Sequence, residues 1–463
     1  MYWVSCTIRT TSRCSSRGLR RQTRPLSHGR HSPLVQRHTR LSIALRLGRK
    51  EGGRLKVFNA DKAGAAGVML ATLVGVAAMS QVFRTIAAIV APGLQRELGL
   101  STEELGIYAG AFHLSFALAQ IPMGLALDLY GVRKTVGSAF LLAVAGALLS
   151  SIATGFPVLM LGQLLIGIGC APAFVGSLFF VSKHFSEKSF ARVSGLVLSF
   201  SGLGLLATGT PLAWVVEQWG WRSAFVATGV VAAANLVCIL VLVRDDHGKN
   251  SGDIAGAIRE TLAILKERQT KGIVALALVG YSSYIALRGL WATPLFIERH
   301  GFTLTDVGNV LLASSVATLV GPPLFGLVRA KGRSRRYLIC ASMATSAGIF
   351  LILAISANWI VDTTMCVALG ALTGFTILQF ADTKSAYDPQ VVGRAFGILN
   401  TAVFLGVAIM QGATGWVAST ASTFSINQFA AVFAFIAAAC LLAMVAFFML
   451  PWPEWEVGSK TDV

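Results

Sequence analysis

The sequence predicts an all-α membrane protein with twelve transmembrane helices in two six-helix, pseudo-symmetric bundles. Of its 463 residues, 54% are hydrophobic and 13% are charged, whereas a soluble domain carries about 25% charged residues. From Gly64 onward, apolar runs of about 20 residues recur, each long enough to cross a bilayer. The second half of the chain also repeats the pattern of the first. These three observations together favour a polytopic membrane protein over a soluble one.

The apolar runs give twelve expected spans, which are taken here in chain order. They are 65–92, 106–127, 135–153, 157–182, 192–216, 223–243, 272–297, 306–328, 337–356, 359–381, 393–418 and 427–450. We therefore expect a six-helix bundle over 64–243, a polar central loop over 244–271, a second six-helix bundle over 272–450 and a tail over 451–463.

The first 60 residues have a different composition from the rest of the chain. Fifteen of the 39 Lys and Arg residues lie before residue 63, where the acids are Glu51 and Asp61. No apolar run typical of a secretory signal is present in this stretch. We predict a disordered basic extension over 1–60. An organelle transit peptide is one interpretation, and an over-extended gene start, with the protein beginning near Val57 or Met69, is the one that we favour.

The charges in the loops alternate from one side of the predicted membrane to the other. One side carries the central loop and a group of basic residues: Arg133, Lys134, Lys183, Lys188, Arg192, Arg329 to Arg336, Lys384 and Arg394. The other side carries Arg96, Arg222 and Arg299. The positive-inside rule makes the first side cytoplasmic. Because the number of helices is even, both termini are then expected in the cytoplasm. The expected location is the inner membrane of the cell. The net charge of +18 is thus explained without nucleic acid.

An internal repeat relates the two halves at a constant offset of 202 residues. The matched pairs are Pro92 and Pro294, Gly99 and Gly301, Gly106 and Gly308, Gly124 and Gly326, Arg192 and Arg394, Gly195 and Gly397, and Gly204 and Gly406. A constant offset over this length indicates duplication of a six-helix unit. Duplicated halves are typical of transporters, whose binding site lies near the midplane between the repeats.

A loop motif between the second and third spans resembles the signature of a known family. Gly124, Asp128, Gly131, Arg133 and Lys134 match G-x-x-x-D-x-x-G-x-R-[KR] of the major facilitator superfamily. The resemblance extends over about residues 64–450 and implies the twelve-helix fold of that family and transport by alternating access. It also implies that the loop acts as a conformational switch, with Asp128 near the N-terminal end of the eleventh span, where the helix dipole favours a carboxylate. A solvated loop acid is the alternative interpretation of Asp128.

Two features depart from the family pattern. The second half keeps a degenerate copy of the loop, in which Ala330 replaces the aspartate. In the fourth span Gln163 stands where many proton-coupled members carry an arginine. The second departure weakens any transfer of a proton–drug antiport mechanism to this chain.

Two arginines lie well inside the predicted spans: Arg84 in the first and Arg288 in the seventh. An arginine at the bilayer centre costs about 2.5–3.5 kcal/mol, and such residues persist where they face a cavity or a partner. No Asp or Glu lies deep in any predicted span, so the counter-ion could be the substrate. The placement of Arg84 and Arg288 is similar to that of the arginines in the organophosphate and anion exchangers of the superfamily. Alternatively, the Arg84 side chain reaches the membrane surface.

Other polar side chains are expected to surround these arginines. Tyr281, Tyr284, Arg288 and Trp291 fall on one predicted helix face, and Gln81 lies one turn from Arg84. His113 in the second span is a candidate proton carrier or hydrogen-bond donor. Each of these residues has an ordinary packing role as its alternative. Three amides of the later spans are further candidates for the cavity: Gln379, Asn400 and Gln411.

The sequence therefore predicts a secondary transporter for a small, anionic solute. The alternatives are a proton-coupled efflux antiporter for apolar or cationic compounds and a non-transporting membrane sensor. No nucleophile–base pair, phosphate loop or metal-ligand spacing is evident, so we expect neither an enzyme, nor a cofactor, nor a metal site. The expected partners are the solute, the lipid bilayer and a coupling ion such as H+, with the chain acting as a monomer.

Overall fold

The structure is a computed structural model, and it describes residues 60–185, 187–244, 263–328, 330, 332–387 and 392–449. The expected extension over 1–60 lies outside the described residues except for Ala60, and the tail 451–463 lies wholly outside them. Most of the expected central loop, residues 245–262, also lies outside this part of the chain.

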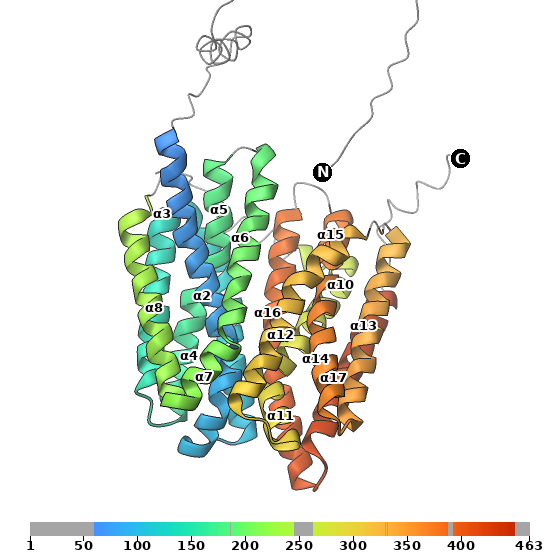
Figure 1. Cartoon of the computed structure of the whole chain (residues 1–463). Coiled ribbons are helices and arrows are strands. Elements are labelled where there is room, and N and C mark those ends of the chain that lie inside the picture. Colours follow the sequence, from blue (N-terminus) through green and yellow to red (C-terminus); the bar gives the residue numbers. More distant parts are fainter. Residues whose placement is uncertain are drawn as a thin grey trace, which may run out of the picture. The chain divides into compact units, whose positions relative to one another are not determined.

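Twelve helices of the described chain are long and apolar enough to cross a membrane, which confirms the predicted count. Figure 1 shows them as a bundle of rods with short connections at both ends. The first six spans are α2 (Ala60–Leu98), two in α3 (Thr102–Ser151), α4 with α5 (Phe156–Cys170, Pro172–His184), α6 with α7 (Glu187–Ala207, Thr210–Trp219) and α8 (Trp221–Leu242). The second six are α10, η1 and α11 (Arg268–Ala286, Leu287–Trp291, Ala292–His300), α12 (Leu304–Leu327), α13 (Gly332–Ile355), α14, η2 and α15 (Trp359–Leu372, Thr373–Phe375, Thr376–Ala386), α16 (Val392–Thr423) and α17 (Gln428–Met449).

The two halves begin their second spans in the same way. Gly99 and Gly301 both take a left-handed backbone conformation, with φ of 65° and 69°, which glycine adopts without steric cost. Two residues later Ser101 and Thr303 each cap a helix and form a capping box with the acid three positions on. These paired turns agree with the offset of 202.

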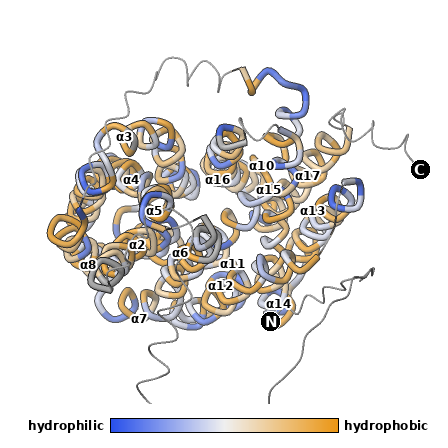
Figure 2. The backbone as a smooth tube through the Cα atoms, turned by 90° about the horizontal axis from the view of Figure 1, so that it is seen from above, coloured by the Kyte–Doolittle hydropathy of each residue, from blue (hydrophilic) through white to orange (hydrophobic). Residues whose placement is uncertain are grey.

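The helices form two groups that lie side by side when the molecule is seen from above (Figure 2). One group contains α2 to α8, and the other contains α10 to α17. Each group has buried apolar side chains, and many large apolar side chains are exposed on the outside of the described helices. In lipid every backbone polar group must be paired within the segment, and continuous helices meet this need.

The two groups touch at one end and separate at the other. We call the end with Ser101 and Thr303 the capping-box end, and the end with Arg133 and Arg335 the basic end. At the capping-box end Gly106 of α3 lies against the backbone of Gln411 in α16, and Gly209 lies against Gly308. Four glycines towards the basic end have open space around the position that a Cβ would take: Gly124, Gly195, Gly326 and Gly397. The bundle is therefore closed at the capping-box end and open at the basic end.

Candidate functional site

Arg84 lies in the middle of α2 and is 8% exposed. Its guanidinium carbon lies 5.2 Å from the ring centre of Phe116 in α3 and 4.5 Å from that of Phe404 in α16. A cation over an aromatic face gains about 0.5–2 kcal/mol, which offsets part of the cost of its burial. Its Nε atom is buried and has no hydrogen-bond partner among the described residues. The guanidinium thus contacts one ring from each half and keeps donor capacity for a ligand.

Arg288 is 1% exposed and lies in η1, a five-residue π-helical segment of the seventh span. Its Nη2 donates to the carbonyl oxygen of Leu205 at 3.0 Å, to Oγ1 of Thr208 at 3.1 Å and to Oγ of Ser315 at 2.8 Å. Leu205 and Thr208 belong to the fifth span and Ser315 to α12. Arg288 therefore joins the two halves, while its buried Nη1 has no partner among the described residues.

His113 and Gln81 lie near Arg84. The His113 ring is fully buried and stacks on Phe404, with 6.4 Å between ring centres. Its Nδ1 lies 3.3 Å from the carbonyl oxygen of Ala109, while Nε2 has no partner in the described part of the chain. Gln81 is partly buried, and its Oε1 also lacks a partner there.

Gln411 of α16 connects the surroundings of the two arginines. A Cβ atom at Gly289 would lie 3.0 Å from Nε2 of Gln411, so this amide packs against the turn that carries Arg288. The same side chain lies near His113, which is a neighbour of Arg84. Gln411 Oε1 is buried without a partner among the described residues. Buried polar atoms are usually satisfied, so this group of open donors and acceptors is suited to a polar ligand or water.

The aromatic residues of the seventh span divide between two neighbours. The hydroxyl of Tyr284 lies 3.0 Å from Oγ of Ser314 and accepts a bond from Thr318 at 2.7 Å, so it faces α12, as Arg288 does. Trp291 instead donates to Oγ1 of Thr414 in α16 at 2.9 Å. The wider π-helical turn between Leu287 and Trp291 changes the helix register. The single face expected for these side chains is therefore split.

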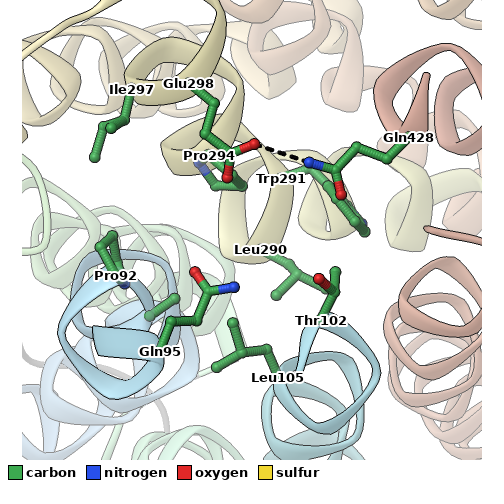
Figure 3. Close-up of a pocket in the computed structure, with 11 residues that line it drawn as sticks. Pro92, Gln95, Thr102, Leu105, Leu290, Trp291, Pro294, Ile297, Glu298 and Gln428 are labelled. Atoms are coloured by element: carbon green, nitrogen blue, oxygen red, sulfur yellow. Dashed lines mark hydrogen bonds between the residues drawn. The ribbon is translucent and has the colours of Figure 1, made fainter. Parts of the chain in front are cut away.

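Tyr281 is partly buried and packs against apolar residues of both halves. Trp291 borders a cavity of about 50 Å³ at the capping-box end (Figure 3). In that cavity the amide of Gln428 donates to the carboxylate of Glu298 at 2.8 Å. Tyr281 therefore lies towards the interface between the halves, and Trp291 lies on the closed side of Arg288.

The motif loop forms a sharp bend between the second and third spans. Gly131, between the two helical parts of α3, has φ of 81° and ψ of 177°, a combination that is essentially restricted to glycine. Thr135 donates to the carbonyl oxygen of Ala126 at 2.9 Å, and Arg133 donates to that of Leu240 in α8. The side chain of Asp128 lies outside the described residues, so its expected position beside the eleventh span stays a prediction.

The buried carboxylates of the described side chains are Asp362 and Asp382, and both have cationic partners in their own half. Asp382 lies 3.0 Å from Nη2 of Arg335 and 3.3 Å from Nε of Arg336. No group of three His, Cys, Asp or Glu residues in the described chain is arranged to hold a metal ion. The acids near the span ends thus serve ion pairs away from Arg84 and Arg288.

Sequence reasoning did not identify four of the residues that hold the arginines in place. Phe116 and Phe404 contact the guanidinium of Arg84, and Thr208 and Ser315 accept from Arg288. Such residues are common in apolar helices, and nothing in their spacing distinguishes them. The internal repeat does not identify Thr208 either, because the matching position in the second half is a methionine.

The sequence profile of the Major Facilitator Superfamily matches residues 73–409 of this chain. The chain belongs to the major facilitator superfamily. The match includes the bend at Gly131 and the spans that carry both buried arginines. The predicted family and the predicted fold are thereby confirmed, and this superfamily member is a multi-pass membrane protein that handles a small-molecule substrate.

Several curated relatives of this superfamily member are named as transporters of organic acids. The chain is 25% identical over 407 residues to the D-galactonate transporter of Escherichia coli O6:H1, with 80% of this chain and 92% of the relative covered. It is 21% identical over 416 residues to a probable galactarate/D-glucarate transporter of Bacillus subtilis, with coverage of 81% and 90%. A probable sulfoacetate transporter of Cupriavidus necator is 25% identical over 259 residues, which cover 52% of this chain and 59% of that one.

Among solved structures, the fold is similar to that of a bacterial homologue of the human lysosomal transporter Spinster. That protein was solved in an inward-facing, occupied conformation and in an inward-facing, unoccupied one. The TM-scores are 0.62 and 0.63, with 14% sequence identity in both cases. These structures cover 82% and 83% of this chain, and 94% and 95% of the other. At this identity the likeness concerns the fold alone.

Proposed function

We propose that this superfamily member is a secondary transporter for a small organic anion, which it binds between Arg84 and Arg288. The observation that carries the proposal is the pair of buried guanidinium groups at the interface, each with a donor that has no partner in the described chain. Arginine binds carboxylate, sulfonate and phosphate oxygens through two parallel hydrogen bonds and remains charged. Tyr281, Gln81 and His113 are the proposed neighbours of the anion, and Tyr284 and Trp291 are proposed to support the site from the seventh span.

The relatives support an acid as the substrate. Three of them are named for D-galactonate, for galactarate and D-glucarate, and for sulfoacetate, which are carboxylates or sulfonates. A sugar acid would also use amide and imidazole groups, and Gln411 and His113 provide buried polar atoms beside the arginines. We therefore propose a hydroxylated organic acid as the first class to test.

We further propose that the basic end faces the cytoplasm of the cell that holds this chain in its inner membrane, with both termini on that side. The basic residues that support this orientation include Arg133, Lys134, Arg335 and Arg394. In this orientation the present conformation is open to the cytoplasm. The anion would reach the arginines from the basic end, and rocking of the two halves would then expose it at the capping-box end.

The experiment is anion uptake into proteoliposomes that contain the purified chain, with labelled D-galactonate and a panel of other aldonates, aldarates and sulfoacetate. We expect Arg84→Gln and Arg288→Gln to lower uptake at least tenfold, because a charge-assisted hydrogen bond contributes about 1.5–3 kcal/mol. Arg96→Gln is the matched control, since Arg96 lies on the same helix but is exposed at its end. Uptake that is unchanged in both test variants would falsify the assigned site.

The same vesicles test whether H+ is the coupling ion, and a separate measurement tests whether the chain is a monomer. If H+ drives uptake, with His113 as its carrier, an uncoupler removes accumulation in the wild type. His113→Gln should then retain exchange of internal for external anion but lose accumulation. Uptake that resists the uncoupler excludes H+ coupling. The molecular mass of the protein in detergent, measured by light scattering, decides whether the chain is monomeric.

A further inference from the structure

The fifth span is interrupted between its two helices, α6 and α7 (Figure 1). α6 ends at Ala207 and α7 begins at Thr210. Gly209, which lies between them, has φ of −89° and ψ of −131°, and this ψ is outside the helical range. Pro211 follows, and it has no N–H group to donate to the preceding turn. The end of α6 therefore lies inside a membrane span and needs other donors for its carbonyl groups.

Arg288, which belongs to the other half, supplies a donor at this helix end. The carbonyl oxygen of Leu205 accepts from Nη2 of Arg288 and from the hydroxyl of Thr208, both at 3.0 Å. The N–H of Gly209 bonds to Leu206 at 3.1 Å, so Leu205 has lost its ordinary helical donor. The carbonyl end of a helix carries partial negative charge, which favours a cation. The end of α6 thus lies where a counter-ion of Arg288 is expected.

The nitrogen atoms of Arg288 are used unequally. Nη2 carries two hydrogen atoms but lies within bonding distance of three acceptors: Leu205, Thr208 and Ser315. Nε donates to Ser315 at 3.2 Å, and Nη1 is buried without a partner among the described residues. A carboxylate binds a guanidinium through two parallel N–H bonds, and either pair of adjacent nitrogens includes Nη2. Arg288 therefore cannot bind an acid in this way until Nη2 gives up a present acceptor.

We propose that the solute acid competes with the end of α6 for Nη2 of Arg288, and that binding of the acid thereby releases the closed capping-box end. The proposal rests on the proposed function, because it assumes that an acid reaches Arg288. We call the bonds from Nη2 to Leu205 and Thr208 the α6 latch. Both acceptors belong to the first half, whereas Ser315 belongs to the same half as Arg288. Loss of the α6 latch thus removes a connection between the halves and leaves the support from Ser315.

This competition gives the acid a different affinity for the two conformations. A ligand shifts a conformational equilibrium only through such a difference. While the α6 latch is intact, Arg288 can offer the acid Nη1 alone. Once the latch is released, Nη2 is free and the acid gains its second parallel bond. The acid therefore binds more tightly to the conformation in which the capping-box end can open.

Thr208 also connects the α6 latch with the surroundings of Arg84. Its hydroxyl lies 2.8 Å from that of Thr85, the residue after Arg84 in α2. Arg84 is 8% exposed and Arg288 is 1% exposed, so an acid that enters from the basic end meets Arg84 first. The two arginines therefore have different roles: Arg84 receives the acid, and Arg288 makes the conformational change depend on the acid.

The first test is binding of D-galactonate to the purified full chain, measured by isothermal titration calorimetry. Thr208→Val removes one competing acceptor of Nη2, so we expect the dissociation constant to fall about threefold or more. Thr383→Val is the matched control, because Thr383 is also buried and its hydroxyl bonds within its own helix. Its dissociation constant should equal that of the wild type. A purely structural role of Thr208 predicts weaker or unchanged binding, and either result overturns the competition.

The second test needs no ligand. Spin labels at the exposed Gln218 and Thr423, near the capping-box ends of α7 and α16, report the distance between the halves by pulsed electron resonance. Without any acid, Arg288→Gln should shift this distance to longer values, because it removes the α6 latch, and Thr383→Val should not. D-galactonate should lengthen the distance in the wild type and cause no further change in Arg288→Gln. An unchanged distance in ligand-free Arg288→Gln overturns the latch.

The two tests distinguish this proposal from the proposed function. If the wild type binds none of the aldonates, aldarates and sulfoacetate, the proposed function fails and the competition fails with it. The ligand-free distances then still decide whether Arg288 holds the capping-box end closed. If the acids are bound and transported but Thr208→Val does not bind them more tightly, the proposed function stands and the competition is wrong.

Discussion

At the scale of single residues, the buried carboxylates of the described side chains depend on partners of opposite charge. Asp362 is fully buried near the capping-box end, where its Oδ2 lies 2.7 Å from Nε2 of His300 and 3.3 Å from Nη1 of Arg299. Arg299 also donates to the carbonyl oxygens of Leu353 and Ser356. Removing one partner of such a buried pair costs more than the pair contributes, because the other charge is left in a medium of low dielectric.

We therefore predict that Asp362→Asn lowers the free energy of unfolding by about 3–5 kcal/mol. Thermal unfolding in detergent, followed by the accessibility of the buried thiols to a fluorescent maleimide, measures the change. Asp306→Asn is the control, since this exposed acid caps α12 and its loss costs only about 0.5–2 kcal/mol. Equal shifts for the two variants contradict the assignment of Asp362 as a buried counter-ion.

Thr208 is a second residue on which several contacts depend. Its hydroxyl lies 2.8 Å from that of Thr85 in α2 and accepts a bond from Arg288. It thus connects the first, fifth and seventh spans where the halves are in contact. The bond between Arg288 and Thr208 joins different halves, so it can form only while the capping-box end is closed.

We predict that Thr208→Val opens the capping-box end more often. The substitution removes the hydrogen bonds of Thr208 to Arg288 and Thr85, each of which contributes about 0.5–1.5 kcal/mol, and this loss falls on the present conformation. Distances between spin labels on α7 and α12, measured by pulsed electron resonance, should shift towards longer values. Thr85→Val removes the contact with Thr208 and a bond to Gln81 in its own helix, but it leaves the bond from Arg288 to Thr208 and should shift the distances less. A distribution that stays unchanged in Thr208→Val argues against this role.

At the scale of elements, two local departures from regular α-helix position the site and the motif loop. The π-helical η1 directs Arg288 towards α12 and Trp291 towards α16. The bend at Gly131 separates the two helical parts of α3, so the third span turns back across the membrane from the second. Both departures occur in the segments that the proposed mechanism uses.

We predict that Gly131→Ala destabilises the protein by about 1–3 kcal/mol, because alanine is strained at this φ and ψ. Gly124→Ala, seven residues earlier in the same motif, is the control. Gly124 is helical and has open space around a Cβ, so alanine there should be neutral or stabilising by up to about 1 kcal/mol. The midpoint of thermal unfolding in detergent compares the two, and similar midpoints contradict the assigned strain.

At the scale of the whole molecule, the helix contacts between the halves follow a regular register that ends before the basic end. Successive contacts between the fifth and eighth spans advance by seven residues: Gly209 with Leu312, and Gly202 with Leu319. The next pair in this register is Gly195 with Gly326, and both have open space. In the internal repeat with its offset of 202, Gly195 corresponds to Gly397 and Gly326 corresponds to Gly124. These two glycines also have open space around the position of a Cβ. Glycine allows close backbone approach, so these pairs are suited to contact when the basic end closes.

We predict that Gly397→Leu blocks that closure and leaves the present conformation intact. Nothing lies within 4 Å of a Cβ at Gly397, so the unfolding midpoint should stay close to that of the wild type. Uptake into proteoliposomes should fall at least tenfold, because a leucine occupies the space that Gly124 would enter. Gly348→Leu is the matched control, since this position is equally open but lies on α13. Unimpaired uptake in Gly397→Leu excludes contact between these glycines during transport.

The sequence by itself determined the twelve spans and the family. Apolar runs in lipid must pair their own backbone groups and therefore form helices, so composition alone leads to spans such as α8 and α17. The duplicated turns at Gly99 and Gly301 depend on local backbone geometry, which the residue types reveal directly. The motif also indicated a loop between the second and third spans, and the bend at Gly131 lies in that loop. These features rest on interactions between near neighbours in the chain.

Only the tertiary structure decided what each candidate side chain contacts and which end is open. Arg288 bonds to Leu205 and Thr208, which are 83 and 80 residues away in the sequence, and no spacing rule connects such positions. Trp291 turned towards α16 because one π-helical turn changed the register. The separation at Gly124 and Gly397 depends on how two complete bundles pack. Packing between distant segments sets these contacts, and the same sequence can support more than one arrangement of its halves.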